Sequence, residues 1–355
     1  MEGMPARIIG KRELDSWVTR LLERGEVIAP VRGPGGDEVF ASVASPGEIL
    51  WKFENPLLPP KSFLLPQVET LARIRRENGH HRVEPIGSGG PRVLLNVRNC
   101  DVAGLAYLEE MHRRDPPDES VARRARDLTL VSLACTTACP LGFCVCCDAG
   151  PFLEDRFDLQ LTELGDALFV EVGSDKGQAL VDLAPRLFRE PTEAEVARRR
   201  EAEKTALASF GEETCHFGSA MRRISTRRVA EGLWEAMTPW CLECGGCNFA
   251  CPTCYCFSIS DRDVKDGAWV RCRLWDSCQY AAFTMEASGH NPRQAQEERM
   301  KRRFHHKVSA QYFKRDGRVG CVGCGRCIKV CMGTTDMPAV VEALRKGAWD
   351  GGREA

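Results

Sequence analysis

The first 99 residues of this 355-residue chain contain no cysteine, although the whole chain has 19. An odd number of cysteines cannot all pair with one another, so a complete framework of internal disulfides is excluded. With 43% hydrophobic residues, the chain can bury a core without covalent cross-links. Thiolate ligation of metal therefore explains the sulfur better than disulfide formation does.

Long hydrophobic runs and a strong charge of either sign are also absent. No stretch approaches the roughly 20 apolar residues of a membrane helix, and residues 1–17 lack the apolar core of a secretion signal. The formal net charge of -1 gives no general attraction to nucleic acid. We therefore expect a cytoplasmic protein that binds neither membrane nor nucleic acid, in a compartment where thiols stay reduced.

Recognisable substrate machinery is missing as well. The sequence has no G-x-G-x-x-G after a predicted strand, no P-loop, no H-E-x-x-H and no convincing Ser/His/Asp set. These absences exclude the common nucleotide-binding and metalloprotease motifs. They favour a binding or electron-transfer role over catalysis by the chain itself.

Two cysteine runs in the second half have the spacing of bacterial ferredoxins. CLECGGCNFACP (241–252) is C-x2-C-x2-C-x3-C-P, and CVGCGRCIKVCM (321–332) repeats it with Met332 in place of proline. Three cysteines of such a run hold one cluster and the fourth holds the other. The spacing thus predicts two [4Fe-4S] clusters, one on Cys241, Cys244, Cys247 and Cys331, the other on Cys321, Cys324, Cys327 and Cys251. A zinc ribbon would use two C-x2-C pairs instead.

The insertion between the two runs, residues 252–320, holds four further cysteines: Cys254, Cys256, Cys272 and Cys278. They bind another metal or pack beside the clusters, and the sequence leaves both interpretations open. The insertion also holds a basic stretch, 294–315, with a helical pattern. We expect this helix to be a solvated face or a docking surface, with His305 and His306 at the surface.

The first half has the pattern of an α/β domain. Apolar runs at 92–100 and 127–135 flank a helical pattern at 101–114 and predict a βαβ unit with two parallel strands. Residues 157–173 alternate polar and apolar side chains and predict a hairpin or two edge strands. A charged stretch near 190–206 marks a domain boundary. We expect an α/β domain over 1–200 and a mainly helical domain over 201–355, which carries the split dicluster core.

A third group of cysteines gathers at the βαβ unit. Cys100 ends the first predicted strand and Cys135 ends the second, so both face the crevice at the carboxyl edge of the sheet. The loop CTTACPLGFCVCC (135–147) adds Cys139, Cys144, Cys146 and Cys147. This is enough sulfur for a third cluster. Zinc and simple packing remain alternatives, because the spacing is not a standard ferredoxin pattern.

Several segments together resemble the iron–sulfur β subunit of cytoplasmic NiFe hydrogenases, or sulfhydrogenases, in the 4Fe-4S dicluster family. They are KSFLLPQVETL (61–71), VRNCDVAGL (97–105), CPTCYCF (251–257), WDSCQ (275–279), ASGHNPR (287–293) and CVGCGRC (321–327). The corresponding iron–sulfur subunit of anaerobic sulfite reductase is similar. The resemblance covers most of 30–335. It implies an electron-transfer subunit with two [4Fe-4S] clusters, in a hetero-oligomer with a flavin subunit that uses NAD(P)H and a catalytic subunit.

The third group departs from the family pattern in two places. Asn99 stands where the family has proline, and FCVC (143–146) stands where the family has TCFC. Cys139 and Cys147 have no counterpart in the family. The resemblance implies a third cluster on Cys100, Cys135, Cys144 and Cys146. In an extended segment, Cys144 and Cys146 would face the same side.

The function that we expect is electron relay in a hydrogenase-type complex. One alternative is the same role in an anaerobic sulfite reductase or another flavin-linked reductase. Another is a stand-alone iron–sulfur enzyme that acts on sulfur or thiol substrates, and a third is an interaction module stabilised by zinc or a cluster. The sequence leaves the terminal substrate and the direction of electron flow open.

Overall fold

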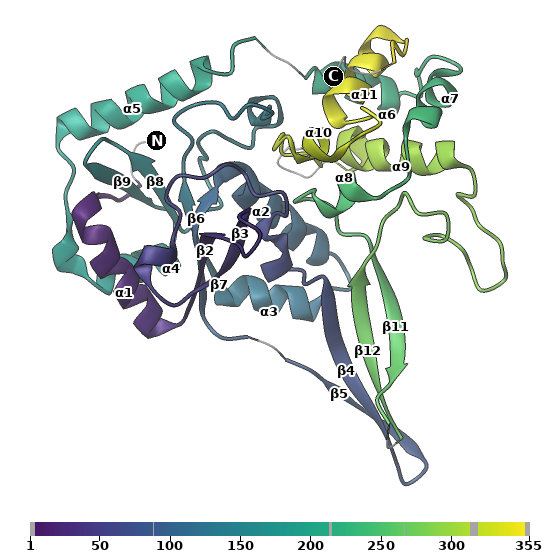
Figure 1. Cartoon of the computed structure of the whole chain (residues 1–355), viewed down its shortest axis with the longest axis horizontal. Coiled ribbons are helices and arrows are strands. Elements are labelled where there is room, and N and C mark those ends of the chain that lie inside the picture. The colour runs from purple at the N-terminus through teal and green to yellow at the C-terminus, as the bar shows by residue number, and fades with distance from the viewer. Residues whose placement is uncertain (1–3, 88, 213–214, 266, 313–318, 352–355) are drawn as a thin grey trace.

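The computed structural model describes the chain apart from residues 1–3, 88, 213–214, 266, 313–318 and 352–355 (Figure 1). Eight strands form one sheet in the order β10-β1-β9-β8-β7-β6-β2-β3. Their bounds are β1 Ala6–Gly10, β2 Glu26–Arg32, β3 Glu38–Val43, β6 Arg92–Arg98, β7 Leu128–Leu133, β8 Leu159–Glu163, β9 Ala167–Val172 and β10 Phe188–Arg189.

The predicted βαβ unit is confirmed. Strands β6 and β7 are parallel neighbours in the sheet, and helices α2 (Asn99–His112) and α3 (Glu119–Asp127) lie between them in the chain. The predicted hairpin is confirmed too, because β8 and β9 pair antiparallel. Gly165 turns between them at a φ of 76°, a conformation that glycine adopts without strain.

Helices cover both faces of the eight-stranded sheet. Helices α1 (Leu14–Arg24) and α4 (Asp175–Asp182) pack on the face that carries Leu95. Trp17 of α1 is fully buried there and donates a hydrogen bond to the carbonyl oxygen of Leu180 at 3.0 Å. The opposite face, which carries Leu94, is covered by α2 and α3.

The core on the Leu94 face continues into the C-terminal half of the chain. It includes Leu108 of α2 together with Phe304 of α9 (Gln296–Val308) and Val341 of α11 (Met337–Lys346). The remaining helices are α5 (Glu193–Ala208), α6 (Phe217–Ser225), α7 (Leu233–Met237), α8 (Gly246–Phe249) and α10 (Arg326–Val330). The boundary proposed near 190–206 falls on α5, which crosses one side of the molecule (Figure 1).

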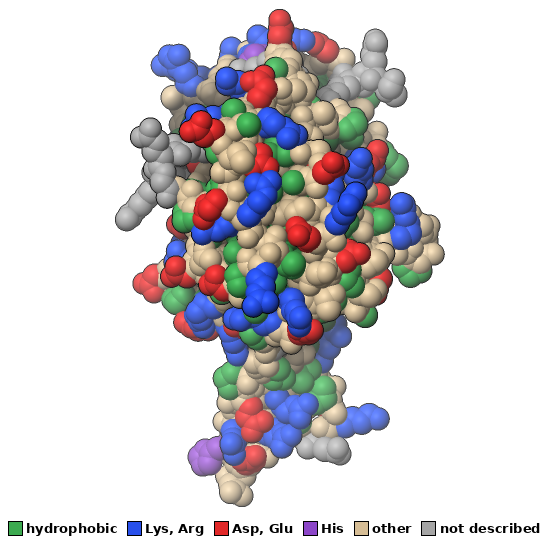
Figure 2. All heavy atoms as spheres, turned by 90° about the vertical axis from the view of Figure 1, so that its left-hand side faces the viewer, with side chains coloured by type: hydrophobic (Ala, Val, Ile, Leu, Met, Phe, Trp, Pro, Cys, Tyr) green, Lys and Arg blue, Asp and Glu red, His purple; other side chains and the backbone are tan. Residues whose placement is uncertain are grey.

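The expectation of a mainly helical second half is corrected by a second sheet. Strands β4 (Val68–Glu77), β5 (His80–Pro85), β11 (Phe257–Asp263) and β12 (Ala268–Trp275) pair in the order β11-β12-β4-β5. They project from the body as an arm (Figures 1 and 2). The insertion therefore contributes strands as well as a helix, and the chain has a mixed α/β composition throughout.

Buried ion pairs link the two halves. Glu69 of β4 accepts hydrogen bonds from Arg124 of α3 at 2.6 Å and from Arg273 of β12 at 2.5 Å. Arg326 donates two hydrogen bonds to Asp101, at 2.5 and 2.8 Å. The Asp101 side chain is completely buried and that of Arg326 is 2% exposed. On the face shown in Figure 2, by contrast, basic and acidic side chains are intermixed over the surface.

Asp101→Asn should lower the free energy of unfolding by about 3–5 kcal/mol, because it leaves the Arg326 guanidinium as an uncompensated buried charge. Urea unfolding of the anaerobic holoprotein measures the loss. The control is Asp261→Asn, which breaks the solvent-exposed pair with Arg271 on the arm and should barely move the unfolding midpoint. Equal midpoints for the two variants would contradict the role of the Asp101 pair.

Candidate iron–sulfur centres

The two ferredoxin runs fold into matching turns. Gly245 (φ 72°, ψ -5°) precedes α8, and Gly325 (φ 77°, ψ -9°) precedes α10. Both glycines adopt the left-handed conformation that other residues rarely take. Helices α8 and α10 pack against each other. The repeat in the sequence is thus a repeat in the backbone.

The structure brings the fourth cysteine of each run to the other run. Burial and then the nearby thiols, Cys331 among them, raise the pKa of Cys241, and they raise that of Cys247 to about 11. In the same way burial, followed by the charge of Cys251, raises the pKa of Cys324 to about 12. These neighbours are compatible with crossed ligation, which stays a prediction from the spacing. Cys244 is exposed at the surface.

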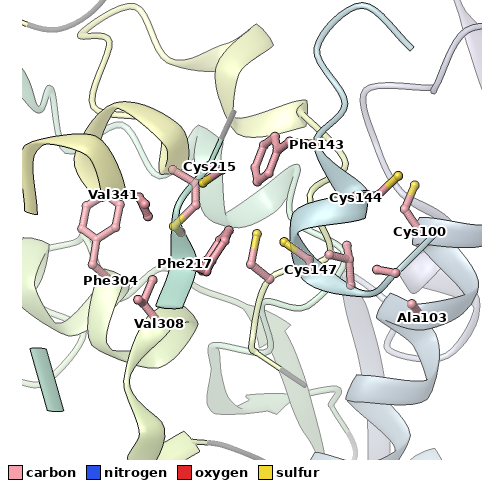
Figure 3. Close-up of a cluster of buried hydrophobic side chains, with 14 of the residues drawn as sticks. Cys100, Ala103, Phe143, Cys144, Cys147, Cys215, Phe217, Phe304, Val308 and Val341 are labelled. Carbon is pink, nitrogen blue, oxygen red and sulfur yellow. The ribbon is translucent and has the colours of Figure 1, made fainter. Parts of the chain in front are cut away.

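The third group forms where the βαβ unit places it. Cys100 lies in the first turn of α2, Cys135 follows β7, and the sulfur atoms of Cys100 and Cys144 point toward one another (Figure 3). Burial raises the pKa of the Cys144 thiol, and the thiols of Cys135 and Cys139 add to the effect. Burial, Asp101 and then the Cys324 thiol raise the pKa of Cys100. The third group therefore adjoins the second ferredoxin run.

The segment that carries Cys146 is not extended. Residues Cys144–Cys147 form a 3-10 turn, in which side chains three apart, not two apart, share a side. Cys147 accordingly faces the ferredoxin half, where its thiol is hydrogen-bonded to that of Cys321. Cys139, which has no counterpart in the family, is the loop thiol that lies near both Cys135 and Cys144.

The loop 135–147 rests directly on the second ferredoxin turn, a contact that the sequence pattern did not predict. The backbone N–H of Phe143 donates to the carbonyl oxygen of Gly323 at 2.7 Å. A side chain at Gly323 would come within 2.4 Å of the Phe143 oxygen, and one at Gly325 within 2.3 Å of the Leu141 oxygen. Glycine is therefore required at both positions. The two glycines, spaced two residues apart in the second cysteine run, are the only sign of this contact in the sequence.

The basic helix faces inward, contrary to expectation. Arg299, Arg303 and Lys307 follow one another at intervals of four along α9, and they are 4%, 6% and 5% exposed. His305 and His306 are half-buried rather than exposed, and burial lowers the pKa of each. The last part of the predicted helix, 313–315, lies outside the described residues. We call Arg299, Arg303 and Lys307 the cationic stripe.

The cationic stripe meets the cysteines. Although burial lowers its pKa, Arg303 has a raised pKa because of the thiols of Cys247, Cys327, Cys254 and Cys331. Lys307 has a raised pKa for the same reason, through Cys251 and Cys254. Within the described residues, neither side chain pairs with a carboxylate; Arg303 donates to the Thr335 carbonyl oxygen at 3.0 Å, and Lys307 to the Thr253 hydroxyl.

Buried cations and crowded thiols have complementary needs. A buried charge is costly without a counter-ion, and several neighbouring thiols resist ionisation until a metal supplies positive charge. Clusters held by thiolates carry net negative charge, so they would satisfy both. The residues present therefore fit such clusters. All the cysteines are free thiols, and among the described residues no three His, Cys, Asp or Glu side chains converge on a single-ion site.

Comparison with known proteins identifies the dicluster region. A family model for a 4Fe-4S dicluster domain matches residues 240–335, which span both cysteine runs. No solved structure matches the chain. In the described part of the chain, no helix is long and apolar enough to cross a membrane.

One curated relative covers nearly the whole chain. The sulfhydrogenase 2 subunit beta of Pyrococcus furiosus is 31% identical over 332 residues, which are 93% of this chain and 96% of that protein. The similarity therefore extends through the α/β half and the arm as well as the dicluster region. The resemblance inferred from the sequence is confirmed: this chain belongs to the family of iron–sulfur beta subunits of sulfhydrogenases.

Proposed function

We propose that the chain relays electrons through [4Fe-4S] clusters between a flavin subunit linked to NAD(P)H and a catalytic subunit of hydrogenase type. The observation that carries the proposal is the continuity of three cysteine groups. Cys331 lies with Cys241 and Cys247, Cys251 lies with the second run, and Cys324 adjoins Cys100. Centres in such a series can pass electrons without substrate machinery on the chain.

The first ferredoxin run brings this series to the surface. Cys321 is 9% exposed, whereas Cys244 is exposed. Beside Cys244, the apolar side chains of Trp240, Leu242 and Met332 are 45%, 60% and 79% exposed. We call these three residues the apolar rim. Exposed apolar groups around a redox centre fit a partner that brings its own centre close.

The apolar rim is a better docking site than the basic helix. The cationic stripe of α9 faces the cysteines, so it is not available to a partner. At the other end, Leu141 is 40% exposed beside the third cysteine group and marks a second contact. Partners at the two ends would make the chain a bridge, with residues 1–200 serving one contact and 201–355 the other.

The third cluster is part of this proposal. Cys100, Cys135 and Cys144 would supply three of its thiolates, and the same loop would supply the fourth. The family pattern assigns that fourth ligand to Cys146, while Cys139 lies near Cys135 and Cys144. Without this cluster, the path from the dicluster core would end inside the protein.

Anaerobic purification from the native source should give a hetero-oligomer, in which this 39.5 kDa chain accompanies flavin and catalytic subunits. Leu242→Asp should weaken that association at least tenfold, about 1.4 kcal/mol, because it places a charge in the apolar rim. Ile259→Asp, which alters a 48% exposed side chain on the arm, is the control. Native mass and NAD(P)H-linked turnover are the readouts. Full turnover by a lone chain would refute the relay role.

Iron per chain tests the third cluster. The wild type should hold about twelve irons, and the double variant Cys100→Ser/Cys135→Ser about eight, because the two ferredoxin runs are untouched. Cys272→Ser, a buried cysteine on β12, is the control and should retain about twelve. Equal iron near eight in wild type and double variant would mean that the loop holds no cluster.

Arg303→Met should lower the reduction potential of both dicluster centres by about 60 mV or more, which is about 1.4 kcal/mol for a one-electron couple. The reduced cluster carries one more negative charge, and the buried guanidinium stabilises it. Redox titration followed by EPR gives the potentials. Lys301→Met is the control, since Lys301 pairs with Glu297 and Glu298 on the outer side of α9. A shift of equal size in the control would contradict the role of Arg303.

A further inference from the structure

Two cysteines of the insertion meet at the base of the arm. Strands β11 and β12 pair Phe257 with Trp275, and the backbone N–H of Asp276 donates to the carbonyl oxygen of Cys256 at 2.9 Å. Cys278 comes two residues after Asp276. It lies in the turn that follows the end of β12.

The two thiols lie close together. Both line a small cavity together with Cys254, Tyr107 and Lys307, and each thiol shifts the pKa of the other. Cys278 is 5% exposed and Cys256 is half-buried. Neither belongs to a ferredoxin run or to the third cysteine group, so the proposed clusters leave both thiols unused.

Polar groups converge on the sulfur of Cys278. The side-chain amide of Asn248 donates to it at 3.1 Å, and that of Gln279 donates at 3.6 Å. Asn248 follows Cys247 directly in α8. Donors aimed at a sulfur stabilise its thiolate, which is the form that attacks in thiol–disulfide chemistry. A purely packing cysteine needs no such donors.

We propose that Cys256 and Cys278 are a redox-active pair that interconverts between dithiol and disulfide and stores two electrons beside the relay. Oxidation forms one S–S bond and releases two protons to water and two electrons. The two electrons would pass to the two [4Fe-4S] centres proposed for the ferredoxin runs, one to each; Cys247, a ligand proposed for the nearer centre, lies near Cys278. Reduction by the same centres reverses each step. This inference rests on the proposed relay function.

A two-electron store has a clear use in this setting. Hydride carriers such as NAD(P)H deliver electrons in pairs, whereas each cluster accepts one. A dithiol at the start of a series of one-electron centres holds the second electron of a pair until the series can take it. The chain would then pass electrons without leaving a half-reduced flavin in its partner.

Counting electrons tests the pair. Holoprotein is reduced with dithionite, desalted under nitrogen and titrated with oxidised methylene blue until no more dye is reduced. The wild type should deliver two more electrons per chain than Cys278→Ser, while Cys272→Ser matches the wild type. After titration, alkylation and peptide mass spectrometry should find Cys256 joined to Cys278 in the wild type only.

Iron analysis and EPR on the same samples separate the possible failures. Loss of iron in Cys278→Ser and Cys256→Ser would make these residues metal ligands and overturn the pair. Unchanged iron with equal electron counts and two alkylated thiols would overturn it as well. Absence of cluster signals in the wild type would instead refute the relay, whatever the thiols do.

Discussion

The buried ion pair between Arg326 and Asp101 fixes the second ferredoxin turn on the α/β half. Arg326 lies between Cys324 and Cys327 in the chain, and Asp101 follows Cys100, so one pair sets the distance between two cysteine groups. Its third hydrogen bond, to the Pro56 carbonyl oxygen at 2.7 Å, leaves the guanidinium little freedom. The close approach of the loop 135–147 to Gly323 and Gly325 depends on this placement.

Charge balance is the second constraint on this architecture. The cysteines gather where the cationic stripe of α9 is buried, and each set is costly without the other or without metal. Folding and cluster insertion are therefore coupled, since the clusters supply the anionic charge that Arg303 and Lys307 require. The stripe also places the Arg303 guanidinium near cysteines of both runs.

Local patterns in the sequence predicted the features of the structure that depend on residues close together in the chain. Two apolar runs around a helical pattern indicated parallel β6 and β7, which the structure confirms. The crossed ligation indicated by the spacing of the two runs stays a prediction. The sequence patterns did not predict the arm, because both of its outer strands are polar and largely exposed and show no apolar face. The burial of α9 was not predicted either, because its counter-charges come from cysteines far away in the chain. The sequence contains no local signal for the 3-10 turn at 144–147, so an extended segment was the expectation there.

The insertion between the cysteine runs is more than a spacer. Closing a loop of this length costs little more than closing a short one, because the entropy grows with the logarithm of length. In return residues 252–320 supply the cationic stripe, half of the arm and the pair Cys256 and Cys278. The α/β half encloses the dicluster core from one side, and the insertion encloses it from another. Splitting the ferredoxin motif thus places buried positive charge and further thiols beside the cysteine runs.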